Sequence, residues 1–146
     1  MEVKGFKNFL RKYFVQCGFE KIGSKYYRNG NGFLCMIDVG RSYYSPRYYF
    51  DYYFFLGNFE KPYVIVQESW KNYTPYVGTR FDFDGRKCDF FELEWSEDEL
   101  KVSLDDNMQR LIFPPFEIGK KYLADNFGTL YTTFLNDETI RRLLNE

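Results

Sequence analysis

Apolar residues recur at intervals of three and four over residues 3–17, and this spacing predicts an amphipathic helix at the start of the chain. Gly18 follows directly and is a typical residue to end a helix. Basic residues occupy the opposite side, where we expect a solvated helix face. The apolar stripe consists of Val3, Phe6, Phe9, Leu10, Tyr13, Phe14 and Cys17, and the basic side of Lys4, Lys7, Arg11 and Lys12.

Alternating apolar and polar positions replace this pattern in the middle of the chain and predict strands. Residues 21–28 and 33–39 flank the sequence Asn-Gly-Asn-Gly at 29–32, which favours a tight hairpin turn. Further strands are predicted at 47–56, 63–68, 79–83 and 89–95, with sequential antiparallel pairing. In the strand at 47–56 we expect one face to be core, namely Tyr48, Phe50, Tyr52, Phe54 and Leu56.

The last third of the chain predicts helices. Ser96 and Glu99 have the spacing of a capping box, which predicts a helix to about residue 111, interrupted by Pro114 and Pro115. A second helix is predicted at 116–126, and a final one, capped by residue 136 or 137, through 144. The whole pattern predicts a single α+β domain over residues 1–146. We expect a mainly antiparallel sheet with the N-terminal and C-terminal helices packed on one face and the other face open.

The composition argues against most catalytic and metal-binding classes. The chain has no histidine, the commonest general acid/base and metal ligand. Cys17, Cys35 and Cys88 are widely spaced, which argues against a disulfide framework or a structural zinc site. No uninterrupted apolar run resembles a secretory signal or a membrane span. We therefore expect a cytoplasmic protein that binds no metal or cofactor and does not enter a membrane.

Charge is unevenly distributed although the net charge is only −1. Residues 1–28 contain seven Lys or Arg and two Glu, a net charge of +5. Residues 82–106 contain ten acidic and three basic residues, a net charge of −7. Either the two regions neutralise each other within the fold, or the acidic region attracts a basic partner.

The N-terminal third resembles a known family. An aromatic amphipathic helix, the sequence GFEKIGSKYYR at 18–28, an apolar strand ending near Arg41 and Ser42, and a strand rich in aromatic residues are similar to the bacterial domain-of-unknown-function family 4304. The resemblance is best over residues 6–56, although this chain has tyrosines in the 47–56 strand where that family is less aromatic. It implies no catalytic residues. Because some members of similar families look like immunity proteins, it favours a role in binding a protein partner.

The side of the sheet away from the helices is the candidate site. A surface of tyrosine, arginine and carboxylate is suited to recognition, because tyrosine supplies contact area with few torsions to freeze and arginine supplies a planar fork of donors. The alternative is an ordinary solvated face on which Arg47 or Arg80 pairs with a neighbouring carboxylate. Besides Asp38, the candidate partner-binding residues are Arg47, Tyr49, Asp51, Tyr53, Arg80, Asp82, Glu92 and Glu94.

Other chemistries fit the residues less well. Glu92 and Glu94 lie on one side of a predicted strand, as a glycosidase pair would, but alternating glutamates are common on exposed strands. Acidic residues beside the tyrosines argue against nucleic-acid binding. The DFDG sequence at 82–85 lacks the ligands of a calcium loop. We therefore predict a non-enzymatic protein that binds a protein partner through its open sheet face. A basic toxin, bound in the manner of an immunity protein, is one such partner. A small carboxylate-dependent enzyme or a carbohydrate-binding module is the alternative, and exposed aromatic residues are also compatible with a homodimer.

Overall fold

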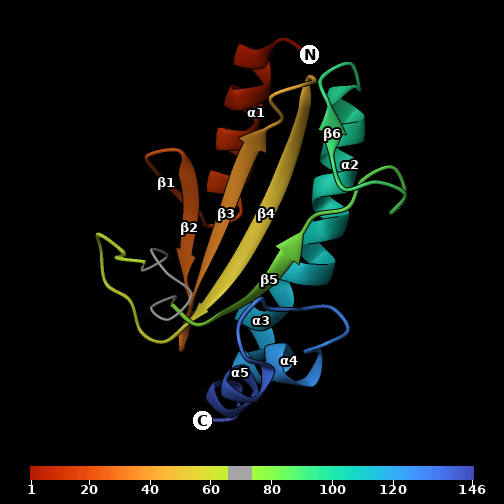
Figure 1. Ribbon diagram of the computed structural model, residues 1–146. Helices are drawn as coiled ribbons and strands as arrows, with labels where there is room; N and C mark the ends of the chain where they lie inside the picture. Colours follow the sequence, from red (N-terminus) through yellow and green to blue (C-terminus); the bar gives the residue numbers. More distant parts are fainter. Residues whose placement is uncertain (66–73) are drawn as a thin grey trace.

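The computed structural model describes residues 1–65 and 74–146 and is built on an antiparallel sheet (Figure 1). Five strands pair in chain order: β1 (Glu20–Ile22), β2 (Lys25–Asn29), β3 (Phe33–Arg41), β4 (Arg47–Leu56) and β5 (Tyr76–Arg80). A sixth strand, β6 (Phe91–Glu92), pairs with the start of β4, on the same edge as β5 but beyond its end. This arrangement confirms an α+β fold with a mainly antiparallel sheet.

The helices lie on one face and at one end of this sheet. Helices α1 (Val3–Gln16) and α2 (Glu97–Asn107) lie side by side behind the sheet in Figure 1. A π-helical turn, η1 (Met108–Ile112), continues α2, and the shorter helices α3 (Phe113–Ile118), α4 (Lys120–Asp125) and α5 (Asp137–Leu144) gather below it. The predicted start and end of α1 are confirmed, and Gly18 follows with a φ of +87°, a left-handed conformation that favours glycine.

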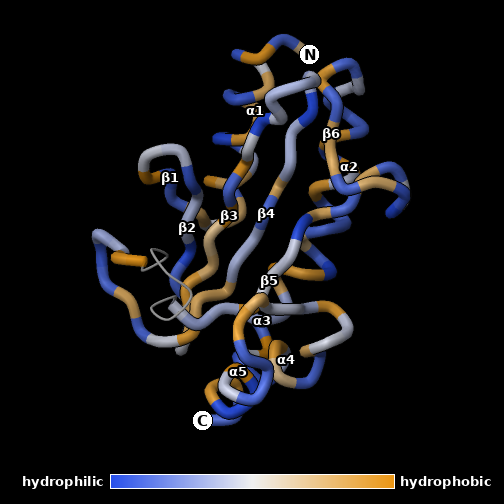
Figure 2. Tube along the Cα trace, in the orientation of Figure 1, coloured by the Kyte–Doolittle hydropathy of each residue, from blue (hydrophilic) through white to orange (hydrophobic). Residues whose placement is uncertain are grey.

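The core lies between the helices and the predicted apolar face of β4. Phe50, Tyr52 and Phe54 have no exposed surface. Phe50 stacks on Phe81 with 6.0 Å between ring centroids, and Phe6 of α1 stacks on Phe91 of β6 at 5.6 Å. Figure 2 shows that α1 carries hydrophobic and hydrophilic residues together, as an amphipathic helix on the core must. The alternation in β4 therefore identified the buried face correctly.

Several predicted strand limits are wrong. Residues 21–28 are not one strand, because the chain turns at Gly23 and Ser24 and pairs β1 with β2. The strand predicted at 79–83 lies earlier, at β5, and the one predicted at 89–95 is reduced to the two residues of β6. Residues 63–65 form no strand, and the rest of the strand predicted at 63–68 lies outside the described residues. Short strands carry too few alternating positions to fix their limits.

The two prolines do not end the helix that starts at Ser96, contrary to the prediction. Both lie in the first turn of α3, the part of a helix where proline is tolerated best. Pro115 still cannot donate to the carbonyl of Leu111, four residues earlier. The buried hydroxyl of Tyr131 donates to that carbonyl at 2.7 Å. The helical path therefore continues to Gly119, and the chain turns there before α4.

The helical caps match the sequence well. The Ser96 hydroxyl accepts from the Glu99 amide at 3.1 Å at the start of α2. The Asn136 side chain accepts from the Thr139 amide at 3.0 Å at the start of α5, so residue 136 is the cap. Both predicted helix starts are therefore confirmed.

The sheet face opposite the helices is divided into two parts. Near the end of β4, Leu34, Met36 and Phe55 are buried beneath side chains from the segment that follows β4. Phe59 and Ile65 belong to this cover. The expectation of an open face is therefore wrong for this half. The half near the start of β4 carries polar and charged residues, and the candidate site lies there.

Candidate functional site

Strand register brings most of the predicted site residues onto one surface. Asp51 of β4 lies opposite Asp38 of β3 and Arg80 of β5, and Arg47 lies opposite Glu92 of β6. Side chains two residues apart share a face, so Tyr49 and Tyr53 lie on the same side as Asp51. We call this surface, opposite the helices, the polar face, and define it as Asp38, Arg47, Tyr49, Asp51, Tyr53, Arg80, Asp89, Phe90 and Glu92.

Arg80 is held by three neighbours at the centre of the polar face. Its Nε donates to Asp51 Oδ1 at 2.7 Å, and its Nη1 donates to Asp89 Oδ2 at 3.0 Å. The guanidinium carbon lies 4.3 Å from the centre of the Tyr49 ring. Hydrogen bonding to Asp51 raises the pKa of Arg80 above its usual value. The guanidinium is therefore fixed in position and charged.

Arg47 repeats this arrangement at the start of β4. Its Nε donates to Glu92 Oε1 at 3.1 Å, and its guanidinium carbon lies 4.0 Å from the centre of the Phe90 ring. The Phe90 and Tyr49 rings meet edge to face, 6.4 Å apart, and this contact links the two arginines. The cross-strand ion pairs expected of an ordinary solvated face are thus present, but each arginine is also stacked on an aromatic ring.

A row of four charges crosses the sheet through this site. Lys25, Asp38, Asp51 and Arg80 are consecutive partners across β2, β3, β4 and β5. Two carboxylates therefore face each other on neighbouring strands, which is unfavourable unless cations offset them. Asp51 is paired with Arg80. For Asp38 the described residues provide no ion pair within 4.0 Å, and it is the one uncompensated carboxylate of the row.

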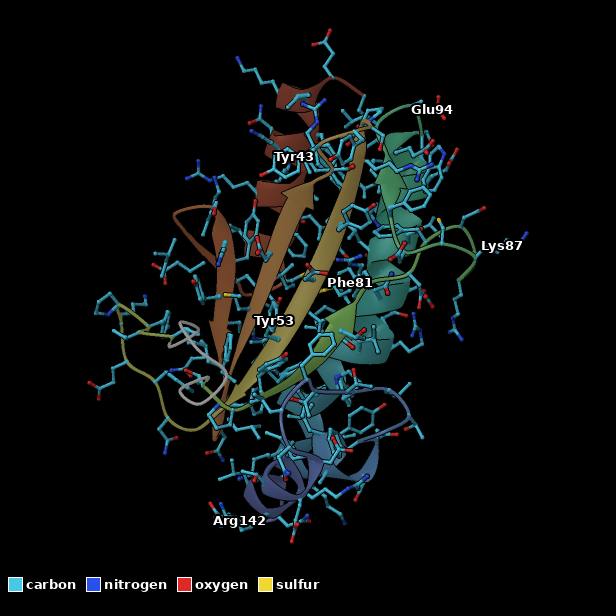
Figure 3. The ribbon with its side chains drawn as sticks, in the orientation of Figure 1. Tyr43, Tyr53, Phe81, Lys87, Glu94 and Arg142 are labelled. Carbon is cyan, nitrogen blue, oxygen red and sulfur yellow. The ribbon has the colours of Figure 1, made fainter. Side chains whose placement is uncertain are left out.

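These charges and partial burial alter the neighbouring tyrosine. Burial, followed by the charge of Asp51, raises the pKa of Tyr53 to about 12, with smaller effects from Tyr76 and Asp38. The Tyr53 ring stacks on Phe55 at 5.6 Å and meets Tyr76 edge to face at 5.3 Å. Figure 3 shows Tyr53 near the middle of the sheet. Tyr53 is therefore a neutral, packed side chain at neutral pH.

A hollow of about 390 Å³ opens beside Arg80. Gly78 at its base has no side chain, and a Cβ there would come within 2.1 Å of the Tyr52 carbonyl oxygen. Phe134 at its rim is 98% exposed, so this ring has almost no packing of its own. The residues that line the hollow are Asp51, Tyr53, Tyr76, Gly78, Thr79, Arg80, Asp89 and Phe134.

No protein-family model, curated protein or solved structure matches the chain significantly. The resemblance of residues 6–56 to the family 4304 therefore stays a prediction. In the part of the chain that the structure describes, no helix has the length and hydrophobicity needed to cross a membrane. Within residues 1–65 and 74–146, no group of three or more cysteine and carboxylate side chains is placed to hold a metal ion. The geometry of the polar face is thus the basis for a functional proposal.

Asp82 does not share the polar face with the other candidates. Its carboxylate accepts from Arg110 Nη2 of η1 at 2.9 Å. Its backbone N–H donates to the side chain of the fully buried Asn107, whose amide donates in turn to the Asp82 carbonyl at 2.7 Å. Asp82 therefore joins the end of β5 to the helices. The sequence suggested strand alternation through residue 83, but β5 ends at Arg80 and the alternation stops there.

Glu94 lies beyond β6, in an exposed turn (Figure 3). A hydrogen bond and charge repulsion from Glu92 raise its pKa. Glu92 itself is paired with Arg47. This arrangement does not favour the glycosidase alternative.

Sequence reasoning did not include Asp89, Phe90 and Phe134 in the site. A signal existed for Phe90, because it alternates with Glu92 along the predicted strand and so falls on the same side. Asp89 reaches Arg80 only because the chain turns back after β5. For Phe134 there was no signal, since it comes from a segment 54 residues away from Arg80 that lies beside β5. Thr132 in that segment pairs with Gly78.

The basic and acidic regions of the chain do not neutralise each other through ion pairs. Among the described residues, the acidic side chains of 82–106 pair with cations of their own region, of β4, of β5 and of η1, namely Arg86, Lys101, Arg47, Arg80 and Arg110. The two regions do meet: the Tyr13 hydroxyl donates to Asp105 at 2.6 Å, and Phe6 stacks on Phe91. Mutual neutralisation of the two regions therefore stays a prediction, because no ion pair among the described residues joins them.

The three cysteines are free. Cys35 is fully buried, and burial raises the pKa of its thiol well above the usual value. Cys17 is half-buried beside Tyr13, and burial raises its pKa as well. Because the thiolate is the reactive form, these two cysteines are poorly suited to nucleophilic chemistry.

Proposed function

We propose that the polar face binds a protein partner and catalyses no reaction. The observation that carries this proposal is the pair of arginines stacked on aromatic rings beside a hollow whose rim residue, Phe134, is 98% exposed. Aromatic and arginine side chains dominate the energetics of protein interfaces. Side chains already fixed by stacking and ion pairs lose little conformational freedom when a partner docks, which favours binding.

The charges on this face support a basic partner. The polar face has four carboxylates, Asp38, Asp51, Asp89 and Glu92, and two arginines, each in an ion pair. Lys25 lies beside the face, opposite Asp38, but Asp38 has no ion pair among the described residues. Complementary charge accelerates association and makes it sensitive to salt. In the specific form suggested by the resemblance of the N-terminal third, the protein is cytoplasmic and captures a basic toxin as an immunity protein does.

A carbohydrate-binding module is the second candidate. The observation that favours it is the hollow itself, where Tyr53, Tyr76 and Phe134 surround the ion pair of Asp51 with Arg80. Rings that stack on a sugar and polar groups that fix its hydroxyls are a suitable lining for such a ligand. The two candidates differ in the size of what binds, a whole interface or a single ring.

A charge reversal tests the main proposal. Wild-type protein is immobilised on a resin and exposed to a lysate of the source organism, and stoichiometric partners are identified by mass spectrometry. Calorimetry with the two purified proteins then measures the affinity. Asp38→Lys should weaken binding at least tenfold, because it removes the uncompensated carboxylate and places a cation in the row. Asp125→Lys on α4, which is exposed and outside the polar face, makes the same charge change and serves as the control.

Two outcomes would overturn the proposal. One is that no stoichiometric partner is captured under conditions where the protein is folded. The other is that the Asp38 and Asp125 variants bind the captured partner as tightly as the wild type. Alanine at Tyr53 is a poorer probe, because its stacking on Phe55 makes a loss of folding hard to separate from a loss of binding.

A further inference from the structure

The hollow beside Arg80 has the shape of a receptacle for one side chain. Its volume of about 390 Å³ is at the lower end of the range for small-ligand sites. Gly78 in its lining has no side chain, so backbone forms this part of the wall, and a Cβ there would meet the Tyr52 carbonyl oxygen of β4. The Phe134 ring stands at the rim and is 98% exposed, so it is free to cover a guest.

The carboxylates at the hollow retain acceptor capacity. Asp51 uses Oδ1 and Asp89 uses Oδ2 to accept from Arg80. Their other oxygens have no donor among the described residues, and an ionised carboxylate accepts several hydrogen bonds. Asp38 adds a third negative charge directly across from Asp51. A guest with several N–H donors and a positive charge would therefore satisfy these acceptors.

The aromatic lining selects for the same kind of guest. Tyr53, Tyr76 and Phe134 present rings, and a cation is attracted to a ring face. Arg80 lies against Tyr49 in this way on the same surface, 4.3 Å from the ring centre. A guanidinium is planar, stacks on rings and donates in a fork that bridges two carboxylates, whereas an ammonium is a compact point charge.

We infer that this hollow receives an arginine side chain of the protein partner, with Phe134 over the guanidinium and Asp51 and Asp89 as its acceptors. This inference rests on the proposed function, since it names the anchor residue of the same interface. Anionic groups such as phosphate are disfavoured, because the two carboxylates that line the hollow, Asp51 and Asp89, outnumber its one cation, Arg80.

A nuclear magnetic resonance titration of the ¹⁵N-labelled protein tests the inference without the partner. The probe is N-acetyl-arginine amide, and N-acetyl-citrulline amide, which has nearly the same shape but no charge, is the matched ligand. We expect millimolar binding of the arginine probe, with the largest shift changes at Gly78, Thr79 and Phe134. The citrulline probe should bind at least fivefold more weakly.

Two variants locate the site. Phe134→Ala and Asp89→Asn alter side chains that are largely exposed, so both should fold normally, and each should weaken binding of the arginine probe about threefold to tenfold. Tyr44→Ala is the matched control, because Tyr44 is an aromatic residue 97% exposed in the turn between β3 and β4, outside the hollow. It should bind the probe as the wild type does.

The results separate this inference from the proposed function. No shift changes at the hollow, or equal binding of arginine and citrulline probes, would overturn the arginine anchor. Binding of methyl glucoside at the hollow in place of arginine would overturn it in favour of a carbohydrate. The proposed function would survive either result if Asp38→Lys still weakens binding of a captured partner. Conversely, binding of the arginine probe without capture of any partner would overturn the proposed function and leave the arginine site standing.

Discussion

Replacing Asn107 by alanine should destabilise the protein strongly. Asn107 lies in the helical layer, outside the polar face. Asn107 is the one polar residue with no exposed surface among the described residues. Its Oδ1 accepts from the Asp82 amide at 3.1 Å. Its Nδ2 donates to the carbonyls of Asp82 and Ser103, at 2.7 and 2.8 Å. Its Oδ1 also accepts from Arg110 Nη2 at 3.3 Å. Alanine removes all four bonds and leaves the space empty.

The magnitude follows from the groups left without partners. The Asp82 N–H and C=O both lose their side-chain partner, and a buried unsatisfied polar group costs about 1–3 kcal/mol. Two such groups give an expected loss of about 2–6 kcal/mol in the free energy of unfolding. The change is large compared with the roughly 5–15 kcal/mol by which most domains are stable.

Urea unfolding followed by circular dichroism measures this loss directly. Asp106→Asn is the control, because the Asp106 carboxylate is 47% exposed and its ion pair with Arg110 should contribute less than about 1 kcal/mol. A loss below about 1 kcal/mol for Asn107→Ala would refute the reasoning. It would mean that water or a shift of the chain satisfies the Asp82 backbone, and that this network does not fix the end of β5.

Two further predictions concern the polar face. The pKa of Tyr53 is raised to about 12 by burial and by Asp51, so the folded state holds its proton above the unfolded value of about 10. The contribution of this group to the free energy of unfolding is therefore complete below pH 10 and is lost as the pH rises towards 12. Urea unfolding measured from pH 9 to 12 should show a smaller decline of that free energy for Tyr53→Phe than for the wild type. An equal decline in both proteins would contradict the assignment. Gly78→Ala should lower stability by roughly 2–4 kcal/mol, because its Cβ would meet the Tyr52 carbonyl oxygen at 2.1 Å, and a thermal midpoint equal to that of the wild type would show that β5 accommodates a side chain there.

Local patterns were sufficient where one element carries its own signal. The limits of β4 follow from ten residues of alternation, and its core face from the period of two. The starts of α2 and α5 follow from Ser96 and Asn136, because a cap acts on amides two or three residues away. Short elements gave less, and β1, β2 and β6 have at most five residues each.

The site was only partly accessible in this way. Arg47, Tyr49, Asp51 and Tyr53 were assigned to one surface because they alternate along a single strand. Their partners come from elsewhere: Asp89 from the turn after β5, and Phe134 from the segment beside Gly78. Asp82 was assigned wrongly, because no local signal indicates that Asn107 and Arg110 meet it from the helices.

The sequence by itself determined the fold class, the first helix, the central strand and the chemical character of the polar face. These depend on periodicity and capping, which act within a few residues. Only the tertiary structure decided that the helix continues through Pro114 and Pro115, that half of the second sheet face is covered, and that a hollow forms above Gly78. The physical reason is that each of these depends on groups brought together from distant positions. Tyr131, for example, donates to the carbonyl of Leu111, to which Pro115 cannot donate because it has no N–H.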